Sequence, residues 1–209
     1  MITVLIYGET GLKNKLALMK GLLLKAYLRL HGCKVGRKLK CQSWPLFRSV
    51  PAGNIDIGNA VNIGNRITFD ITCSGRLLIG EGVNLTQDIL ISAAKQVTIG
   101  ERTLIGEQVC IRDADHGTAL GLPMQLQPLN AEEVYLGSDV WIGAGCRILK
   151  GSRIADGAVI GANSVVLKKS NIISNGIYAG CPVRFLKIRC SLTENIAGDP
   201  GAGGTQHGK

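Results

Sequence analysis

The sequence predicts an all-β fold, a parallel β-helix shaped as a triangular prism. Three observations predict it: a six-residue period, an aliphatic residue at each step, and a small residue after many of them. The aliphatic residues recur at Leu136, Ile142, Ile148, Ile154, Ile160 and Val166. A fixed period is typical of a solenoid, and a step of six fits short parallel strands whose aliphatic side chains point inward. The backbone can turn closely at the small residues that follow, Gly137, Gly143, Ala155 and Gly161.

The same step is found earlier in the chain, in three groups separated by slips. The aliphatic residues are Ile57 and Ile63, then Ile79, Leu85 and Ile91, then Ile99, Ile105 and Ile111. The slips, from Ile63 to Ile79 and from Ile91 to Ile99, indicate loops or bulges at corners. Three steps make one coil, so we expect about five to six coils within a domain at 33–189, the first one weak near Val35 and Cys41.

One long insertion interrupts the repeat. The gap from Ile111 to Leu136 is more than four times the usual step, so most of it is surplus to the coil. We therefore expect a protruding loop at 112–130. Long excursions from a regular scaffold are usually functional. This one contains the run Arg112-Asp113-Ala114-Asp115-His116-Gly117.

The basic character of the chain belongs to its N-terminal part. Residues 1–50 hold ten Lys or Arg against one acid, Glu9, which accounts for the whole net charge of +9. Apolar residues at helical spacing predict a helix from about Leu12 to Leu30, within a basic segment at 1–32. Such a helix would cap the open end of the solenoid, or contact an anionic membrane surface or a lipid-linked substrate, and the two roles are compatible. Nucleic acid is not an expected partner, because stacking aromatics and recognition motifs are absent.

The rest of the composition fits a cytoplasmic protein, with peripheral contact at the inner face of the cell membrane as an addition. No apolar run is long enough to span a membrane, and no signal peptide is evident. The seven cysteines form no C-x-x-C pair, which favours free thiols in a reducing compartment. The tail at 190–209 is Gly-rich and aperiodic, so we expect it to be disordered.

The histidine content limits the chemistry. The chain has three histidines, His31, His116 and His207, and only His116 lies in the solenoid region. A zinc site of three histidines is therefore not expected, nor any other metal, and no G-x-S-x-G elbow points to a serine hydrolase. A lone neutral imidazole can act as general base toward an acceptor hydroxyl. Asp113 could orient that ring, and Asp115 could bind acceptor hydroxyls.

Four stretches resemble the left-handed β-helix (hexapeptide-repeat) acyltransferases, above all the sugar O-acetyltransferases of surface-polysaccharide biosynthesis. They are the loop Asp113–Gly117, the run GSDVWIGA from Gly137, the run IADGAVIGANSVV from Ile154, and the run AGCPVR from Ala179. The general rule for parallel crossovers favours a right-handed coil, whereas the resemblance implies a left-handed one. It also implies a homotrimer with acetyl-CoA lying between neighbouring prisms.

The resemblance assigns roles to further residues. His116 matches the family's catalytic histidine, whereas Ala114 replaces a second histidine of that loop. Trp141 matches an aromatic residue beside the substrate, and Thr86 and Asp88 lie on a coil that could face the acceptor. Ala144 and Ala162 match positions where the backbone meets the pantetheine arm. The CoA phosphates would lie near Lys168, Lys169 and Arg184, although the stretch from 168 to 177 departs from the family's turn.

These observations predict an acetyl-CoA-dependent O-acetyltransferase. Its acceptor would be a sugar hydroxyl of a precursor of lipopolysaccharide, capsule or exopolysaccharide. N-acetylation of an amino sugar and acetylation of a small molecule or xenobiotic are alternatives within the same class. A non-catalytic β-helical scaffold subunit is the alternative outside it, although a scaffold needs no loop of this length.

Overall fold

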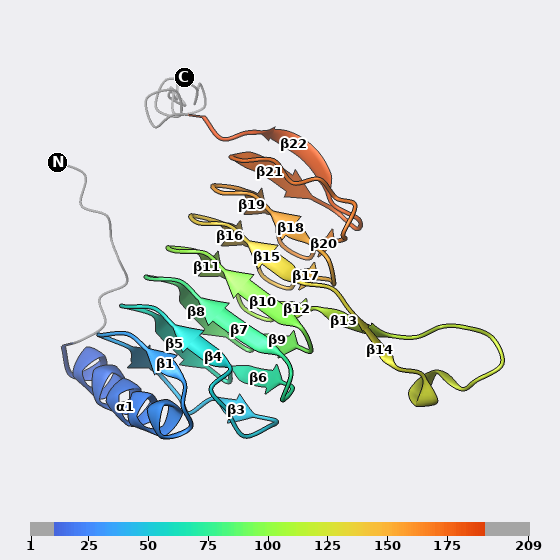
Figure 1. Ribbon diagram of the computed structural model, residues 1–209. Coiled ribbons are helices and arrows are strands. Elements are labelled where there is room, and N and C mark those ends of the chain that lie inside the picture. The colour runs from blue at the N-terminus through green and yellow to red at the C-terminus, as the bar shows by residue number, and fades with distance from the viewer. Residues whose placement is uncertain (1–10, 191–209) are drawn as a thin grey trace, which may run out of the picture.

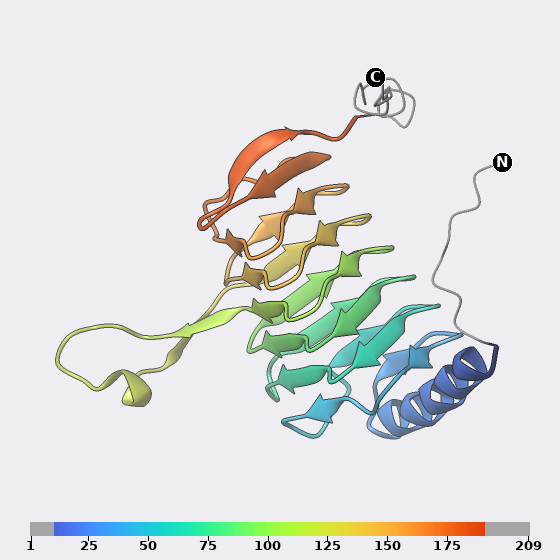
Figure 2. The same ribbon diagram turned by 180° about the vertical axis from the view of Figure 1, so that it is seen from behind.

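The protein forms a three-faced prism with one helix across its base and one arm projecting from its side (Figures 1 and 2). The computed structural model describes residues 11–190. The predicted parallel β-helix is confirmed. Its strands complete six coils and begin a seventh within the described residues, slightly more than the five to six expected. The segment near Val35 and Cys41 does form the first coil.

Each face of the prism is a parallel sheet with one strand from each coil. Face A consists of β1 (Lys34–Val35), β4 (Ile55–Ile57), β7 (Arg76–Ile79), β10 (Gln96–Ile99), β15 (Val134–Leu136) and β18 (Arg153–Ile154). Face B consists of β2 (Lys40–Cys41), β5 (Asn62–Asn65), β8 (Asn84–Gln87), β11 (Leu104–Ile105), β16 (Trp141–Ile142), β19 (Val159–Ile160) and β21 (Gly176–Ala179), with β22 (Arg184–Ile188) antiparallel at its end. Face C consists of β3 (Leu46–Phe47), β6 (Thr68–Ile71), β9 (Leu90–Ala93), β12 (Cys110–Arg112), β17 (Arg147–Ile148) and β20 (Val165–Val166).

The repeating aliphatic residues form the core. Leu136, Ile142, Ile148, Ile154 and Ile160 are all fully buried, one for each face in turn. Burying each such side chain contributes roughly 1.5–3 kcal/mol, so the stack of coils is held mainly by this aliphatic column. The hydrogen bonds between coils then fix which residues face inward.

The slips in the repeat all fall at the corner between faces C and A. On face A, each residue pairs with the equivalent residue of the next coil. The difference between their residue numbers is 22 for the first two pairs of strands, as for Lys34 with Asp56, and 20 for the third pair. The difference is 37 between β10 and β15, and it falls to 18, the length of three hexads, between β15 and β18. The change between the last two values is the insertion predicted from the sequence.

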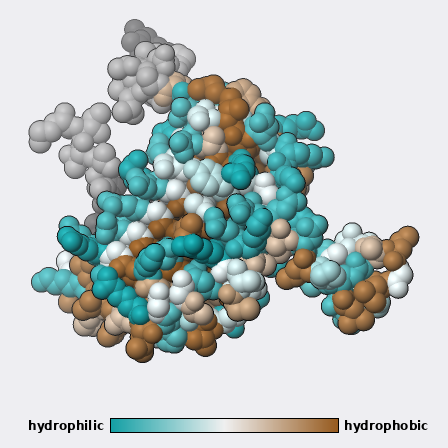
Figure 3. All heavy atoms as spheres, viewed as in Figure 1, coloured by the Kyte–Doolittle hydropathy of each residue, from teal (hydrophilic) through white to brown (hydrophobic). Residues whose placement is uncertain are grey.

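That insertion folds into an arm. Strands β13 (Ala114–His116) and β14 (Leu129–Ala131) pair antiparallel at its root, and the short 3-10 helix η1 (Met124–Leu126) lies near its tip. The tip exposes Leu120, Leu122, Met124 and Leu126. In Figure 3 the arm stands clear of the prism and carries apolar atoms toward its outer end. An isolated two-stranded ribbon is marginally stable in water, so the arm needs contacts beyond its own pairing.

Helix α1 (Gly11–Leu30) covers the first coil. Its buried side carries Ala17, Gly21, Leu24 and Leu28. Gly21 is required there, because a Cβ atom would overlap the carbonyl oxygen of Leu39. The segments 1–10 and 191–209 lie outside the described residues, and the second of them includes all but the first residue of the tail predicted to be disordered. No helix within residues 11–190 is long and apolar enough to cross a membrane.

Candidate active site

A hollow of about 440 Å³ lies at the root of the arm, and we call it the arm pocket. It lies where the corner between faces C and A opens into the arm. Its lining residues are Asp70, Thr72, Ser92, Ala94, Arg112, Ala114, Asp115, His116 and Leu129. Several of these side chains carry hydroxyl, carboxylate or guanidinium groups. The arm pocket is therefore suited to a polar ligand rich in hydrogen-bonding groups.

His116 is held at this pocket by strand pairing. It lies in β13 opposite Leu129 of β14, and its side chain is exposed. The imidazole makes no hydrogen bond with any other residue between 11 and 190. Such a ring has a nitrogen available to take a proton from a bound hydroxyl, which is the first requirement for a general base.

Asp113 has partners other than the ones expected from the sequence. Its side chain is fully buried, and Oδ1 accepts a hydrogen bond of 2.7 Å from the backbone N–H of Ala94. Oδ2 accepts two more of 2.7 Å, from the N–H groups of Lys95 and Gln96. The carboxylate thus secures the corner of the coil below, and it forms no hydrogen bond with His116. Its contacts are those of a structural anchor for the arm, not of a group orienting the ring.

Asp115 lies in the arm pocket beside a cation that the sequence did not single out. The Nζ atom of Lys150 is 3.4 Å from Oδ2 of Asp115, and Lys150 is much the less exposed of the two side chains. This ion pair connects the arm to the turn after β17. It leaves Asp115 half exposed and able to accept further hydrogen bonds from a ligand.

A second hollow, of about 390 Å³, lies on face B, and we call it the face-B groove. It brings together Thr86, Trp141, Ala144 and Ala162, four of the residues singled out in the sequence. Trp141 is 52% exposed on β16, so its ring forms an open wall of the groove. Thr86 also lines the groove, but its hydroxyl oxygen is buried and has no hydrogen-bond partner among the described residues.

The floor of this groove is backbone. The N–H groups of Gly143 and Gly161 bond to carbonyls of the next coil, at 2.8 and 2.7 Å. The next residue in each case, Ala144 or Ala162, donates no backbone hydrogen bond to another residue of the described part. These two N–H groups can therefore bond to a carbonyl group of an extended ligand. A Cβ atom on Gly143 would lie 2.6 Å from the nitrogen of Ala162, so the coils can approach this closely only at glycine.

Four other predicted residues lie outside both hollows. Asp88 forms a two-pronged ion pair with Arg66, both contacts being 2.5 Å, and that hydrogen-bonded guanidinium lowers the pKa of Asp88. Lys168 contacts Glu132 at the base of the arm at 2.5 Å, and its ammonium lowers the pKa of that carboxyl. Lys169 and Arg184 are exposed near the last coil and line neither hollow.

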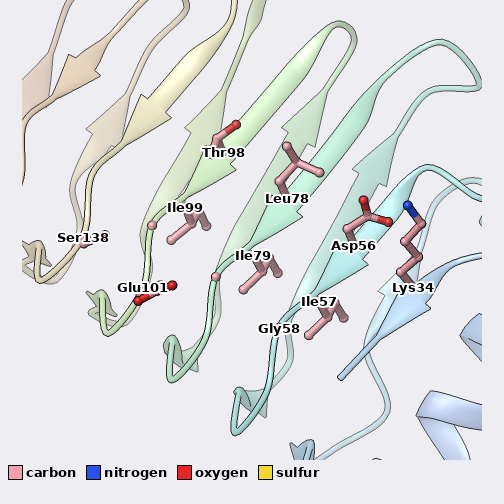
Figure 4. A pocket seen from close by; sticks show the side chains of 12 residues that line it. Lys34, Asp56, Ile57, Gly58, Leu78, Ile79, Thr98, Ile99, Glu101 and Ser138 are labelled. Atoms are coloured by element: carbon pink, nitrogen blue, oxygen red, sulfur yellow. The ribbon is translucent and has the colours of Figure 1, made fainter. Parts of the chain in front are cut away.

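A third hollow, of about 410 Å³, follows face A from Lys34 to Ser138 (Figure 4). Ile57, Ile79 and Ile99 turn into the core there, while Leu78 and Thr98 lie on the other side of the strands. It contains none of the residues predicted for the site. Asp56, its acidic residue on β4, is already paired with Arg76 at 2.9 Å. Its lining offers no histidine, so it is a poorer candidate for acyl transfer.

The sequence did not reveal Gln127, which organises the arm. Its Oε1 accepts a hydrogen bond from the N–H of Ala119 at 2.9 Å, and its Nε2 donates to the carbonyls of Ala119 and Leu122 at 2.8 and 2.7 Å.

Asp70 and Ser92, which line the arm pocket, were also not identified from the sequence. They face each other on adjacent strands, one coil apart in the chain, so the coil length alone could have indicated their proximity.

The two hollows are separate within one chain. The arm pocket is built on face C and the arm, the groove on face B, and no residue lines both. One chain therefore holds its histidine-bearing pocket and its extended groove on different faces of the prism. Among the described residues, no group of three or more His, Cys, Asp and Glu side chains is placed to hold a metal ion.

Comparison with known proteins identifies the family. Residues 133–168 match the bacterial transferase hexapeptide family (six repeats). WbbJ of Escherichia coli (strain K12), named as a putative lipopolysaccharide biosynthesis O-acetyl transferase, is 31% identical over 143 residues, or 65% of this chain and 72% of WbbJ. The chain belongs to the hexapeptide-repeat acyltransferases. This confirms the acyltransferase class expected from its four motifs.

Solved structures share the fold. AntD, an N-acyltransferase from Bacillus cereus solved with dTDP and coenzyme A, superposes with a TM-score of 0.67 at 22% identity, over 83% of this chain and 93% of AntD. A second structure is that of the hexapeptide-repeat acetyltransferase VCA0836 of Vibrio cholerae O1 biovar eltor, solved with acetyl coenzyme A. It superposes with a TM-score of 0.57 at 21% identity, over 85% of this chain and 81% of that protein. Both therefore support the architecture of this acyltransferase.

Proposed function

We propose that this acyltransferase transfers an acetyl group from acetyl-CoA to a sugar hydroxyl of a surface-glycan precursor. The observation that carries the proposal is His116, an unpaired imidazole in a pocket lined by polar side chains of the described part of the chain. WbbJ, the similar protein named for lipopolysaccharide biosynthesis, supports the acceptor class. VCA0836, solved with acetyl coenzyme A, supports the donor.

In the proposed reaction, His116 accepts the proton of the acceptor hydroxyl as that oxygen attacks the thioester carbonyl. The C–O bond forms, the C–S bond breaks, and the proton taken by His116 passes to the departing thiolate. No acyl-enzyme is needed, because both substrates are held together and transfer relies on positioning. Asp115 and the nearby polar residues of the arm pocket would bind the other hydroxyls of the sugar.

The face-B groove suits the pantetheine arm of the donor. Its free backbone N–H groups at Ala144 and Ala162 can bond to pantetheine amide carbonyls, while Trp141 supplies an apolar wall. The phosphates would then lie toward the last coil, near the exposed cations Lys169 and Arg184. Lys168 is paired with Glu132 and contributes less to them.

A homotrimer would bring the two hollows together. The arm pocket of one subunit would face the face-B groove of its neighbour, so that His116 and the donor come from different chains. The apolar tip of the arm supports this arrangement, since Leu120, Leu122, Met124 and Leu126 are all exposed in the single chain. Closed cyclic symmetry would bury three such tips against three identical sites.

An amine acceptor is the second candidate, since AntD, which has the same fold, is an N-acyltransferase. The acceptor atom distinguishes the two: an ester product is cleaved by mild base, whereas an amide is not. An extract of surface-glycan precursors and a panel of amino sugars can be compared in one assay. A base-labile acetyl group on the product supports the sugar hydroxyl.

The test is acetyl-CoA turnover, measured as thiol release with a panel of sugar and nucleotide-sugar acceptors. We expect His116→Ala to lower kcat by roughly 10²–10⁴-fold, the usual contribution of a general base. The matched control is His31→Ala, whose ring contacts the carbonyl oxygen of Tyr27 at 2.9 Å, at the end of α1. Near-wild-type turnover of His116→Ala would refute the assignment of the base.

A further inference from the structure

The base of the prism exposes an apolar surface, which we call the basal apolar face. Its members on α1 are Leu12, Leu16, Met19, Leu22, Leu23 and Leu30, with exposed fractions from 44 to 85%. The first coil adds Trp44, Leu46 and Val50, each more than half exposed. Figure 3 shows apolar side chains gathered along the lower edge of the molecule, where α1 and β3 lie in Figure 1.

Packing on the prism does not account for this face. The side of α1 that packs on the first coil carries Ala17, Gly21, Leu24 and Leu28. At about 100° per residue, Met19, Leu23 and Leu12 project from the opposite side of the helix. An apolar second side is unusual for a helix at a protein surface and indicates that something else covers it.

The charges around the face select an anionic partner. Residues 11–50 contain ten Lys or Arg and no Asp or Glu. Three of these cations are used within the fold, since Lys20, Lys25 and Arg29 donate to carbonyls of the first coil at 2.7–3.0 Å. Lys13, Lys15, Lys34, Arg37 and Lys38 are exposed. A second copy of this basic end would meet like charge, which opposes self-association through the same face.

We propose that α1 and the adjoining first coil dock this protein on an anionic phospholipid bilayer. The helix lies in the plane of the interface, with Met19 and Leu23 among the acyl chains and the lysines at the headgroups. Tyr27 and Trp44, whose rings contact each other edge to face at 5.5 Å, are suited to the interfacial level. The other side of the same helix caps the prism, so the proposed membrane contact is compatible with the capping role.

Docking through the basal apolar face would set the distance of the arm pocket from the membrane surface. The arm leaves the prism at β12, on the fourth coil, which lies about 15 Å above the first at one strand spacing per coil. A glycan attached to a membrane lipid would reach the arm pocket at that height. This part of the inference rests on the proposed function, whereas the docking itself does not.

The experiment is co-sedimentation of the full-length chain with vesicles. One set contains phosphatidylcholine alone, and the other contains phosphatidylcholine with a quarter phosphatidylglycerol. The double variant Met19→Gln/Leu23→Gln removes two outward apolar side chains without touching the prism. The matched control, Leu186→Gln/Ile188→Gln, makes the same change on β22 at the opposite end of the prism, where both residues are also exposed.

We expect wild type and control to sediment with the anionic vesicles only, and less so as salt rises. The basal variant should bind at least tenfold more weakly. Wild type that stays in the supernatant, or a basal variant that binds like wild type, overturns the proposal. So does light scattering that shows concentration-dependent association lost in the basal variant, since the face would then be a self-interface. Thiol release on a soluble acceptor should be unchanged in the basal variant, which separates this test from that of the proposed function.

Discussion

At the residue scale, buried polar contacts decide what a side chain can do. Asp113 lies three positions before His116 in the sequence, yet its carboxylate accepts hydrogen bonds from three backbone N–H groups of the coil below. Asp88 is similarly engaged with Arg66, which lies one coil earlier at the equivalent corner. Side chains near one another in sequence can therefore serve different coils.

We predict that Asp113→Asn destabilises the protein without changing its chemistry. An amide cannot accept from all three N–H groups, and lost hydrogen bonds to a buried charge cost about 2–3 kcal/mol in the free energy of unfolding. Denaturant unfolding measures this loss. The pH profile of kcat/KM should keep its midpoint in the variant, and a shifted midpoint would show that Asp113 acts through His116 after all.

We also predict that the cysteines differ in reactivity. Burial raises the pKa of the Cys41 thiol to about 11, even though Lys20 nearby opposes the shift, and burial also raises the pKa of Cys146. A raised pKa leaves less thiolate in mildly alkaline buffer, so iodoacetamide should spare both thiols in the native protein. The exposed Cys73 and Cys181 should react first, as peptide mass spectrometry would show. Labelling of Cys41 as fast as Cys73 would contradict this.

At the element scale, the arm depends on a few side chains because it has little core. Its ribbon pairs only three residues in each strand, and its loop is closed by the amide of Gln127. The ion pair between Glu132 and Lys168 holds its base against the last full coil. The arm is thus ordered by polar contacts, whereas the prism is ordered by apolar ones.

We predict that Gln127→Ala lowers kcat/KM at least tenfold while the thermal midpoint changes little. Three hydrogen bonds that shape the arm are lost, but none of them contributes to the core. The control is Gln125→Ala on the same arm, whose side chain is exposed. Equal activity of the Gln127→Ala variant and the wild type would mean that the shape of the arm tip does not affect the site.

The fold could be predicted from the sequence to a large extent, and the site only in part. The six-residue repeat predicted the positions of the strands, because an aliphatic residue at every sixth position can point inward only if each repeat forms one side of the coil. It also located the long insertion. The contacts of Asp113 and Lys168 could not be predicted, because the residues that they contact depend on which corners of the prism stack above one another. The length of the early coils would have revealed the pairs of Asp88 with Arg66 and of Asp70 with Ser92.

At the scale of the whole molecule, the two hollows proposed to form the site lie on different faces of the prism. The arm pocket and the face-B groove share no residue. The proposed trimer therefore makes activity a property of the assembly, and a fully folded single subunit would be inactive.

We predict that two inactive variants restore each other. His116→Ala lacks the base, and Ala162→Trp fills the groove. In closed trimers mixed at equal amounts, about a quarter of the sites would combine an intact arm with an intact groove from its neighbour. Co-expression followed by the thiol-release assay measures this fraction. Mixed trimers no more active than either parent would show that each chain carries its own complete site.

The corner between faces C and A has a consequence for how this fold can diversify. Every change in coil length falls there, from the short extension at 94–95 to the whole arm, while the other two corners keep the step of six. Adding one residue at a constant corner would turn the next inward isoleucine to solvent. At the variable corner the chain can lengthen while the core keeps its register. In the proposed function the arm pocket binds the acceptor, so a change of chain length at this one corner would alter acceptor specificity without disturbing the core.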